Sequence, residues 1–283
     1  LVYPYLPGLP GVFLFSSVMI SLMYCCTPGT WVHPIFSTAF ALTMATLTVR
    51  ETDAIGLRLL YLAMAVVLVL VVMEPHMSGT ILIMVGAAAV LFASGINLGW
   101  FVGLGSFAVA ALTFVVFATD YMTRKINLWL DPWSDPQGAG YQPIQSLYAI
   151  GSGGLLGLGL GKSRQKFLYI PEPENDFIFS IVVEELGFIG AAIVLILFAL
   201  LIMRGYWLAL HARDKFGTLT IVGIITLLAA QVFLNIGVVT NLIPNTGISL
   251  PFFSYGGTAL MIQLAEMGII LSISRQIPAP KKD

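Results

Sequence analysis

Carboxylates gather in one short segment of an otherwise apolar chain. Glu172, Glu174 and Asp176 precede a run of apolar residues, and Glu184 and Glu185 lie inside that run. A carboxylate can accept the proton of a hydroxyl group as a general base, and it can also be a ligand of a hard divalent cation. The segment is therefore the first place where this chain could do chemistry.

Asp176 stands where the acidic segment passes into a helix. Pro171 and Pro173 keep the preceding backbone extended, because a residue before proline avoids the helical region. A helix can begin only after them, and Asn175 or Asp176 is then the expected N-cap, with Asp176 near the positive end of the helix dipole. A capping role and a catalytic role for Asp176 both fit this position.

Glu184 and Glu185 are predicted to face different sides of that helix. At about 100° per residue, Asp176, Ser180 and Glu184 share one face, whereas Glu185 points the opposite way. Glu184 would lie roughly 12 Å along the axis from Asp176, at hydrocarbon depth, where an unpaired carboxylate costs at least ~2.5 kcal/mol. We therefore expect these glutamates, and Glu266 further on, to be polar intramembrane residues, with structural pairing and direct function both open. We do not expect Glu184 and Glu185 to do the same job.

Cations follow alternating glycines in the segment 157–166. Lys162, Arg164 and Lys166 come directly after the residues GLGLG. Glycine lets a backbone approach a ligand closely, and lysine and arginine suit a phosphate or diphosphate. The spacing is not that of a Walker loop. The segment therefore predicts an anion site, and a solvated charged loop is the alternative.

A third segment, NLIPNTGISLPFFSYGG, covers residues 241–257 and mixes prolines, glycines and aromatic residues. Such a backbone must pack on protein or line a cavity if it lies at membrane depth. Ser254, Tyr255 and Thr258 offer polar groups there and are predicted to bind substrate. The alternative is an aromatic anchor at the membrane interface.

The elements that must position these residues are membrane helices. The chain has 283 residues, of which 58% are hydrophobic and 10% are charged, against about 25% charged in a soluble globular chain. A spanning helix needs roughly 20 apolar residues. The candidate spans are Val12–Cys26 (short), Pro34–Val49, Leu57–Met73, Thr80–Ser94, Trp100–Thr119, Phe177–Met203, Phe216–Val239 and Gly257–Ile273. The prediction is an all-α polytopic membrane protein with about eight transmembrane helices, forming one domain over residues 1–283.

The stretch Ile144–Leu160 is apolar but rich in glycine, which weakens a helix by about 1 kcal/mol per residue relative to alanine. We predict a loop or re-entrant segment there. Basic residues near the predicted helix ends place both termini in the cytoplasm by the positive-inside rule. Those residues are Arg50, Arg58, Arg204, Arg213, Lys215, Arg275, Lys281 and Lys282. One large extracytoplasmic loop then covers residues 120–176.

Cysteines and histidines predict no redox or metal site. Cys25 and Cys26 are adjacent in an apolar stretch and are read as small apolar residues. The three histidines are far apart in sequence and form no ligand pattern. No signal peptide is expected, since neither a basic region nor a cleavage site follows Leu1. The net charge of −1 gives no reason to expect a nucleic-acid partner.

Four blocks of this sequence resemble the SEDS family (shape, elongation, division and sporulation) of the FtsW/RodA/SpoVE type. They are EPHMSGT at 74–80, the long block 141–190, VVTNLIPNTGISLPFFSYGGTAL at 238–260 and AEMGIILSIS at 265–274. Residues 1–73 are atypical: Trp31 fits an outer motif, but the arginine, glutamate and lysine that accompany it in the family are missing. The form TGISLPFFSYGG is more similar to the division or sporulation branch than to the elongation branch.

The resemblance implies ten spans, eight of them here, with termini inside and a large outer loop. It implies a peptidoglycan glycosyltransferase that polymerises lipid II at the outer face of the bacterial cytoplasmic membrane. The family's essential aspartate falls on Asp176, its companion lysine on Lys166 and its loop glutamate on Glu172. Gln142 and Gln145, in the long block, join the predicted substrate-binding residues.

The resulting hypothesis makes Asp176 the general base for an acceptor hydroxyl, while Lys162, Arg164 and Lys166 stabilise the leaving diphosphate. Arg124 or Lys125 could contribute to the same stabilisation. A divalent cation, Mg²⁺ or Mn²⁺, could share that work with Glu172 or Glu174.

The resemblance also implies a class B penicillin-binding protein (a transpeptidase) and other divisome or sporulation membrane proteins as partners. Two other functions stay open. One is a transporter that flips lipid-linked precursors, with Glu184, Glu185 and Glu266 relaying protons; no repeat halves support it. The other is an inactive membrane scaffold for a transpeptidase.

Overall fold

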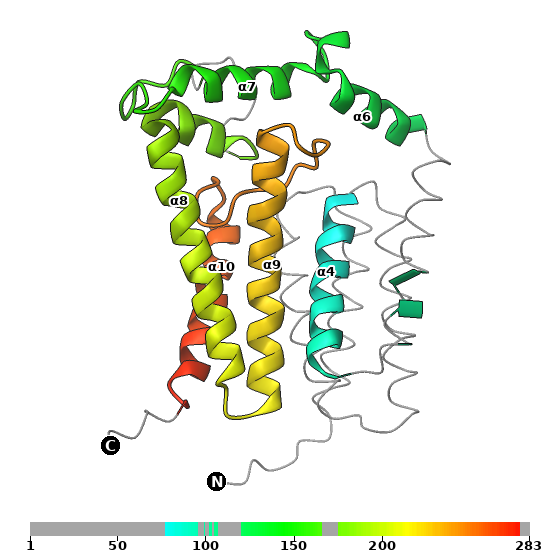
Figure 1. Ribbon diagram of the computed structural model, residues 1–283, viewed down its shortest axis with the longest axis vertical. Coiled ribbons are helices and arrows are strands. Elements are labelled where there is room, and N and C mark those ends of the chain that lie inside the picture. The colour runs from blue at the N-terminus through cyan, green and yellow to red at the C-terminus, as the bar shows by residue number, and fades with distance from the viewer. Residues whose placement is uncertain are drawn as a thin grey trace. The chain divides into compact units, whose positions relative to one another are not determined.

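The computed structural model describes residues 77–95, 99, 102–103, 105–106, 120–165 and 175–277. In this part of the chain every regular element is a helix, and no strand occurs (Figure 1). The all-α prediction is confirmed for these residues. The elements are α4 (Met77–Ala93), α6 (Asp120–Leu130), the short 3-10 helix η1 (Pro132–Ser134), α7 (Tyr141–Gly153), α8 (Ile178–Leu210), α9 (Lys215–Val239) and α10 (Gly257–Ser274).

Three of the described helices, α8, α9 and α10, are long and apolar enough to cross a membrane. They correspond to the predicted spans Phe177–Met203, Phe216–Val239 and Gly257–Ile273, although α8 continues to Leu210. Helix α4 corresponds to Thr80–Ser94 but begins at Met77. The predicted spans Val12–Cys26, Pro34–Val49 and Leu57–Met73 lie outside the described residues, as does most of Trp100–Thr119. The total of eight spans therefore stays a prediction.

The chain falls into two compact units, and α8 and α9 contribute to both. The first unit holds α4, α10 and the parts of α8 and α9 between Met203 and Leu227. The second unit holds α6, η1, α7, the first part of α8 up to Ile202, and residues Leu228–Gly256. The prediction of a single domain over 1–283 stays a prediction.

Close helix contacts hold the first unit together. The hydroxyl groups of Tyr206 on α8 and Thr226 on α9 lie 2.9 Å apart. A Cβ atom added to Gly205 would lie 2.3 Å from Cδ1 of Ile225, so glycine permits this approach of α8 and α9 without a shift of the Ile225 side chain. Small residues have this use wherever helices pack inside a bilayer.

In the second unit, the described part of the segment predicted as a large loop contains three helices. Residues 120–153 form α6, η1 and α7, which Figure 1 shows as a layer of short helices beyond the first turns of α8 and the last turns of α9. Two alternatives were predicted for Ile144–Leu160, a loop and a re-entrant segment, and the loop is wrong as far as Gly153, where α7 ends. Ile144 and Ala149 are buried, and the buried Ser146 hydroxyl donates to the carbonyl of Val239 at 2.8 Å. Such tertiary packing stabilises a helix that local propensity alone would not.

A reciprocal pair of hydrogen bonds joins α6 to the segment 241–256. The indole Nε1 of Trp129 donates to the carbonyl of Asn241 at 3.0 Å, and Nδ2 of Asn241 donates to the carbonyl of Trp129 at 3.4 Å. Asn241 has φ +57°, in the left-handed region that asparagine tolerates better than most residues. Packing on protein, one of the alternatives predicted for this segment, is therefore what the contacts of Asn241 show.

Candidate functional site

Helix α8 is interrupted at Gly187, shortly after Glu184 and Glu185. Gly187 has φ 70° and ψ −174° and interrupts the helix, so residues 178–186 and 188–210 are separate helical pieces. A break inside a membrane helix frees backbone N–H and C=O groups that need new partners. The sequence prediction of one continuous span missed this break.

The glycine-rich loop, residues 154–165, supplies those partners. The amides of Leu158 and Gly159 donate to the carbonyls of Glu184 and Glu185 at 2.9 and 3.0 Å. Below the break, the amide of Phe188 donates to the carbonyl of Gly154 at 2.9 Å. The loop and α8 thus complete each other's backbone hydrogen bonding.

Glycines make this close docking possible. A Cβ atom on Gly157 would lie 2.2 Å from the carbonyl oxygen of Glu185, and one on Gly153 would lie 2.3 Å from that of Val183. Gly157 also has φ +78°, which most side chains rarely adopt. Within the described residues, the backbone that approaches these two glycines is α8, and the predicted approach of a ligand stays a prediction.

Glu184 fastens the loop from the helix. Its carboxylate is 1% exposed and accepts hydrogen bonds from the hydroxyls of Ser163 and Ser152, with the latter at 3.3 Å. It also accepts the main-chain amides of Arg164 at 3.1 Å and Gln165 at 3.4 Å. These hydrogen bonds fit structural pairing, one of the two roles left open for Glu184, and the choice between the two roles stays a prediction.

Glu185 fastens the same loop, and this contradicts the expected division of roles. Its two carboxylate oxygens accept the amides of Gly161 at 2.9 Å and Ser163 at 3.2 Å. Adjacent helical side chains point about 100° apart, but different amides of the loop reach each of the two carboxylates. Glu184 and Glu185 do the same kind of work, although the helical wheel predicted otherwise.

Asp176 lies in the turn 175–177, just before α8 begins at Ile178. The residue next to the first helical one is thus Phe177, one position later than the predicted cap. The half-buried Asp176 carboxylate lies beside Gly247, where an added Cβ atom would be 3.5 Å from its Oδ2. Gly247 has φ +69°, a backbone conformation that favours glycine, so the turn beside Asp176 depends on this residue.

The turn around Asn245 gathers further polar groups beside Asp176. Nζ of Lys125 donates to the Asn245 carbonyl at 3.3 Å, and the amide of Gly247 donates to Asn245 Oδ1 at 3.2 Å. Nδ2 of Asn245 is 3.5 Å from Oε1 of Gln142, one of the predicted substrate-binding residues. We call Lys125, Gln142, Asp176, Asn245 and Gly247 the Asn245 cluster.

Asn235 is a site residue that sequence reasoning missed. It is fully buried on α9, and its Nδ2 donates at 2.7 Å both to the carbonyl of Asp176 and to that of Ile248. The side chain therefore joins the start of α8 to the segment that carries Gly247. A polar residue in the middle of an apolar run was the available signal.

Ser254 makes a second link to the same turn. Its hydroxyl donates to the carbonyl of Asn175 at 2.6 Å and accepts the amide of Leu250 at 2.7 Å. These contacts are with protein groups, so substrate binding by Ser254 stays a prediction. The same holds for Tyr255, which is 71% exposed, and for the half-buried Gln145.

The predicted cations and acids are only partly described. Lys162 and Arg164 are exposed on the glycine-rich loop, whereas Lys166, Glu172 and Glu174 lie outside the described residues. In the first unit, Thr258 is exposed at the start of α10. Glu266 is 8% exposed on the same helix, as expected for an intramembrane carboxylate. The roles predicted for all of these residues remain predictions.

Within the described part of the chain, no three histidine, cysteine, aspartate or glutamate side chains come together as metal ligands. The carboxylates predicted to share a cation with the substrate, Glu172 and Glu174, lie outside it. A divalent cation therefore stays a proposal.

Apolar helices long enough to cross a membrane and a polar cluster at the end of one of them define a polytopic α-helical membrane protein. The profile of the FtsW/RodA/SpoVE family, described as "Cell cycle protein", matches residues 28–278. The chain belongs to this family, and it is an integral protein of the cytoplasmic membrane.

Named relatives agree with this assignment. The chain is 51% identical over 198 residues to stage V sporulation protein E of Bacillus subtilis, covering 70% of this chain and 54% of that protein. It is 42% identical over 218 residues to a probable peptidoglycan glycosyltransferase FtsW of Geobacter metallireducens, covering 77% and 58%. It is also 42% identical over 209 residues to peptidoglycan glycosyltransferase MrdB of Escherichia coli K12, covering 72% and 56%. The chain thus spans a little over half the length of these relatives.

Solved structures share the fold. One, described as "Structural coordination of polymerization and crosslinking by a peptidoglycan synthase complex", matches with a TM-score of 0.74 and 27% identity, over 96% of this chain and 82% of that one. The rod shape determining protein RodA of Thermus thermophilus matches with a TM-score of 0.62 and 26% identity, over 96% and 80%. The predicted resemblance is therefore confirmed.

Proposed function

We propose that this chain is a peptidoglycan glycosyltransferase that polymerises lipid II at the outer face of the cytoplasmic membrane, in cell division or sporulation. The observation that carries the proposal is the placing of Asp176. Asn235 holds its main chain, Ser254 holds that of Asn175, and its carboxylate lies beside Gly247 in the Asn245 cluster. Family membership and the names of the relatives give the reaction class.

In the proposed reaction, Asp176 accepts the proton of a sugar hydroxyl on the acceptor. The hydroxyl oxygen attacks the anomeric carbon of the donor, a glycosidic C–O bond forms, and the bond from that carbon to the diphosphate oxygen breaks. The diphosphate leaves with the electron pair and with the polyprenyl chain. General-base assistance of this kind contributes typically about 10²–10⁴-fold in rate.

Lys125 gives the Asn245 cluster a positive charge. Its Nζ lies 3.3 Å from the Asn245 carbonyl, and Asn245 Oδ1 accepts the amide of Gly247, which lies beside the Asp176 carboxylate. A cation placed where a diphosphate develops negative charge stabilises the transition state. Of the two additional cations predicted from the sequence, Arg124 and Lys125, we therefore favour Lys125, together with Lys166, the lysine implied by the family resemblance, as a cation for the leaving diphosphate. Glu172 or Glu174 would hold a divalent cation if one takes part.

A class B penicillin-binding protein is the proposed partner. A solved structure similar to this chain is described as a peptidoglycan synthase complex that coordinates polymerization and crosslinking, and this supports the proposal. The larger assembly would include other division or sporulation membrane proteins. The topology with eight spans, cytoplasmic termini and an extracytoplasmic site belongs to the same proposal.

The transporter alternative has one observation in its favour, because α8 is a discontinuous membrane helix with a buried carboxylate near its break. Discontinuous helices form the ion and substrate sites of many transporters. Here, however, the glycine-rich loop satisfies backbone groups on both sides of the break, and Glu184 already binds that loop. We therefore place the transporter second.

One reconstitution separates the alternatives. The chain is placed in liposomes with its transpeptidase partner, lipid II and Mg²⁺ or Mn²⁺, and glycan strands are resolved on a gel. We expect strands with the unaltered chain and a loss of at least about 100-fold with Asp176→Asn. Normal polymerisation by Asp176→Asn would refute the catalytic assignment. Lipid II crossing the bilayer without polymer would favour the transporter, and partner binding without either activity would favour the scaffold.

A further inference from the structure

Three leucines of the glycine-rich loop project away from the protein. Leu155, Leu156 and Leu160 are 70%, 79% and 76% exposed. The hydrogen bonds of the loop to Glu184 and Glu185 fix its backbone, so this exposure does not come from a loosely attached segment. An exposed group of apolar side chains on a fixed backbone indicates a surface that contacts lipid or another molecule.

This apolar surface continues onto α8. The amides of Phe188 and Ile189 donate to the carbonyls of Gly154 and Leu155, so the loop and the helix adjoin here. Phe188 is 65% exposed and Ile189 is 50% exposed. The same flank of α8 continues with the exposed residues Ile193, Ile196, Leu197 and Leu200. Since α8 is long and apolar enough to cross a membrane, the leucines extend a flank that lipid covers.

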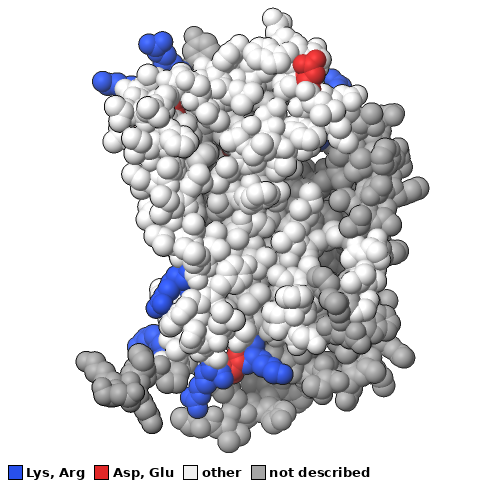
Figure 2. All heavy atoms as spheres, viewed as in Figure 1, with Lys and Arg blue, Asp and Glu red and all other residues white. Residues whose placement is uncertain are grey.

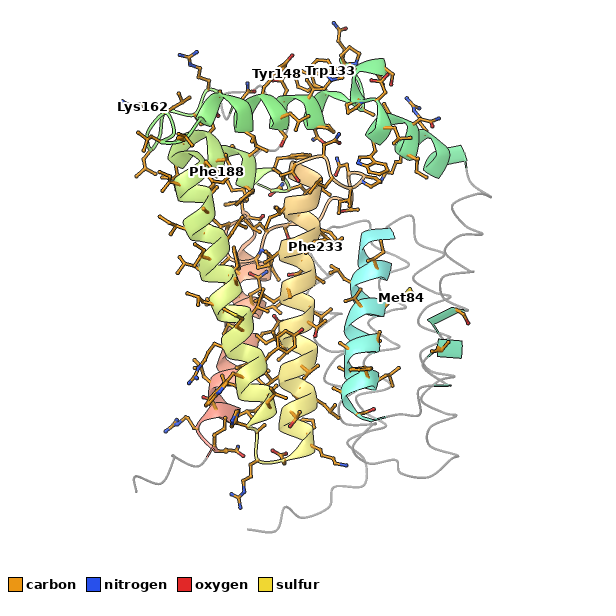
Figure 3. All side chains as sticks on the ribbon, in the orientation of Figure 1. Met84, Trp133, Tyr148, Lys162, Phe188 and Phe233 are labelled. Atoms are coloured by element: carbon orange, nitrogen blue, oxygen red, sulfur yellow. The ribbon has the colours of Figure 1, made fainter. Side chains whose placement is uncertain are left out.

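Two cations stand at the end of this apolar surface. Lys162 and Arg164 are exposed. Within the described part of the chain, neither side chain has a hydrogen-bond or ion-pair partner. Glu184 and Glu185, the acids that bind this loop, accept its main-chain amides and serine hydroxyls instead. Figure 3 shows Lys162 at the outer edge of the loop, and Figure 2 shows basic residues at this end of the second unit above an uncharged flank.

We propose that residues 154–164 form a membrane-interface site for the phosphate of an anionic phospholipid. The leucines enter the acyl region, while Lys162 and Arg164 reach the phosphate level, as long cationic side chains do at membrane interfaces. Anionic headgroups are attracted to cations at such a position. This gives Lys162 and Arg164 a ligand other than the substrate diphosphate first predicted for them, and it does not depend on the proposed reaction.

The depth of the loop is measured with a fluorophore on a single cysteine. In a Cys25→Ala, Cys26→Ala background, Leu156→Cys carries the label, and Gln137→Cys, in the exposed turn before α7, is the matched control. The full chain is reconstituted in nanodiscs. We expect nitroxide lipids labelled near the headgroup to quench the label at 156 strongly and aqueous iodide to quench it weakly, with the reverse at 137. Equal iodide quenching at the two positions would overturn the proposal.

Headgroup preference is measured at the same label with nitroxide phosphatidylglycerol and nitroxide phosphatidylcholine at equal mole fraction. Removal of both cations with Lys162→Gln and Arg164→Gln should lower the relative affinity for phosphatidylglycerol roughly 25-fold, about fivefold for each cation. The matched control, Arg213→Gln with Lys215→Gln, removes the same charge at the turn between α8 and α9 and should leave the preference unchanged. Equal quenching by both lipids in the parent chain, or equal loss in the control, would refute the proposal.

Two competitors identify the source of the phosphate. Inorganic diphosphate should not displace nitroxide phosphatidylglycerol, because it has no acyl chains to lie along the leucines. Undecaprenyl diphosphate should displace it no better than unlabelled phosphatidylglycerol does. Displacement by inorganic diphosphate, or displacement by undecaprenyl diphosphate at a tenfold lower mole fraction, would overturn the phospholipid assignment. Neither result uses polymerase activity, so the proposed function is tested separately.

Discussion

Glu184→Gln tests whether one buried carboxylate holds the glycine-rich loop on α8. Oε1 of Glu184 accepts the Ser152 hydroxyl and the Arg164 amide, and Oε2 accepts the Ser163 hydroxyl and the Gln165 amide. Whichever oxygen becomes the amide nitrogen, one hydroxyl and one main-chain N–H lose their acceptor. The hydroxyl can rotate toward another acceptor, but the main-chain N–H cannot.

The expected cost follows from that stranded N–H group. An unsatisfied buried donor costs about 1–3 kcal/mol, and the remaining bonds weaken because their acceptor is no longer charged. We therefore expect the free energy of local opening of the loop to fall by about 2–3 kcal/mol. At 1.4 kcal/mol for each factor of ten, the amides of the loop should exchange roughly 30–150 times faster.

Hydrogen exchange read by mass spectrometry in nanodiscs measures this opening. The peptide that covers residues 160–166 should lose protection, whereas a peptide within residues 190–198 of α8 should not change, because its hydrogen bonds lie beyond the break at Gly187. The melting temperature is a poorer measure, since loss of a buried charge also relieves a desolvation cost and can offset the lost bonds.

Glu185→Gln is the matched control for this reasoning. Glu185 is only half-buried and accepts two amides, so its substitution should accelerate exchange in the same peptide by a smaller factor. If Glu184→Gln changes protection of residues 160–166 by less than about threefold, the carboxylate does not hold the loop. If it loosens residues 190–198 equally, the effect is global unfolding and the loop argument fails.

Two further substitutions test the rest of the second unit. Gly187→Ala should destabilise the protein by more than about 2 kcal/mol, because Gly187 has φ +70° and an added Cβ atom would lie 2.3 Å from the amide nitrogen of Gly157. The control is Gly268→Ala on α10, where nothing lies within 4 Å of an added Cβ atom, and it should be neutral or slightly stabilising. Similar melting temperatures for the two variants would contradict the docking of the glycine-rich loop on α8. Asn235→Leu should lower the free energy of unfolding by about 2 kcal/mol, because the carbonyl of Asp176 loses its hydrogen-bond donor. The same substitution should lower kcat of polymerisation more than it raises KM. A change in KM alone would count against a positioning role for Asn235.

Hydrophobic runs predicted most of the described fold because membrane helices satisfy their backbone hydrogen bonds locally. The bounds of α9 and α10 agree with the predicted spans within one residue at each end. Helix α7 was missed for the opposite reason, since its stability comes from packing of Ile144, Ser146 and Ala149 against distant residues. Composition suggests a loop there, and only tertiary contact shows the helix.

The candidate site divides in the same way. The prolines before Asp176 predicted that a helix can begin only after them, and α8 begins at Ile178. That limit is a property of the local backbone, although the exact cap was missed by one residue. The partners of Asp176 could not be predicted, since Asn235 and Gly247 come from later segments whose pairing leaves no periodic pattern. Sequence reasoning therefore found the residue that could act as a base and missed the residue that holds it in place.

The glycine-rich loop shows why a dense motif need not be a ligand site. The alternating glycines at 157–161 were predicted to let backbone approach a phosphate, but at Gly157 the approaching backbone is α8. Glycine permits close approach without specifying what approaches. In the same docked loop, Glu184 and Glu185 accept amides and hydroxyls, and within the described residues neither forms an ion pair with Lys162 or Arg164. The way the loop packs on α8 therefore leaves its cations and its leucines exposed side by side. Because they adjoin the apolar side of a membrane helix, the phosphate of an anionic phospholipid is the ligand that we propose for them.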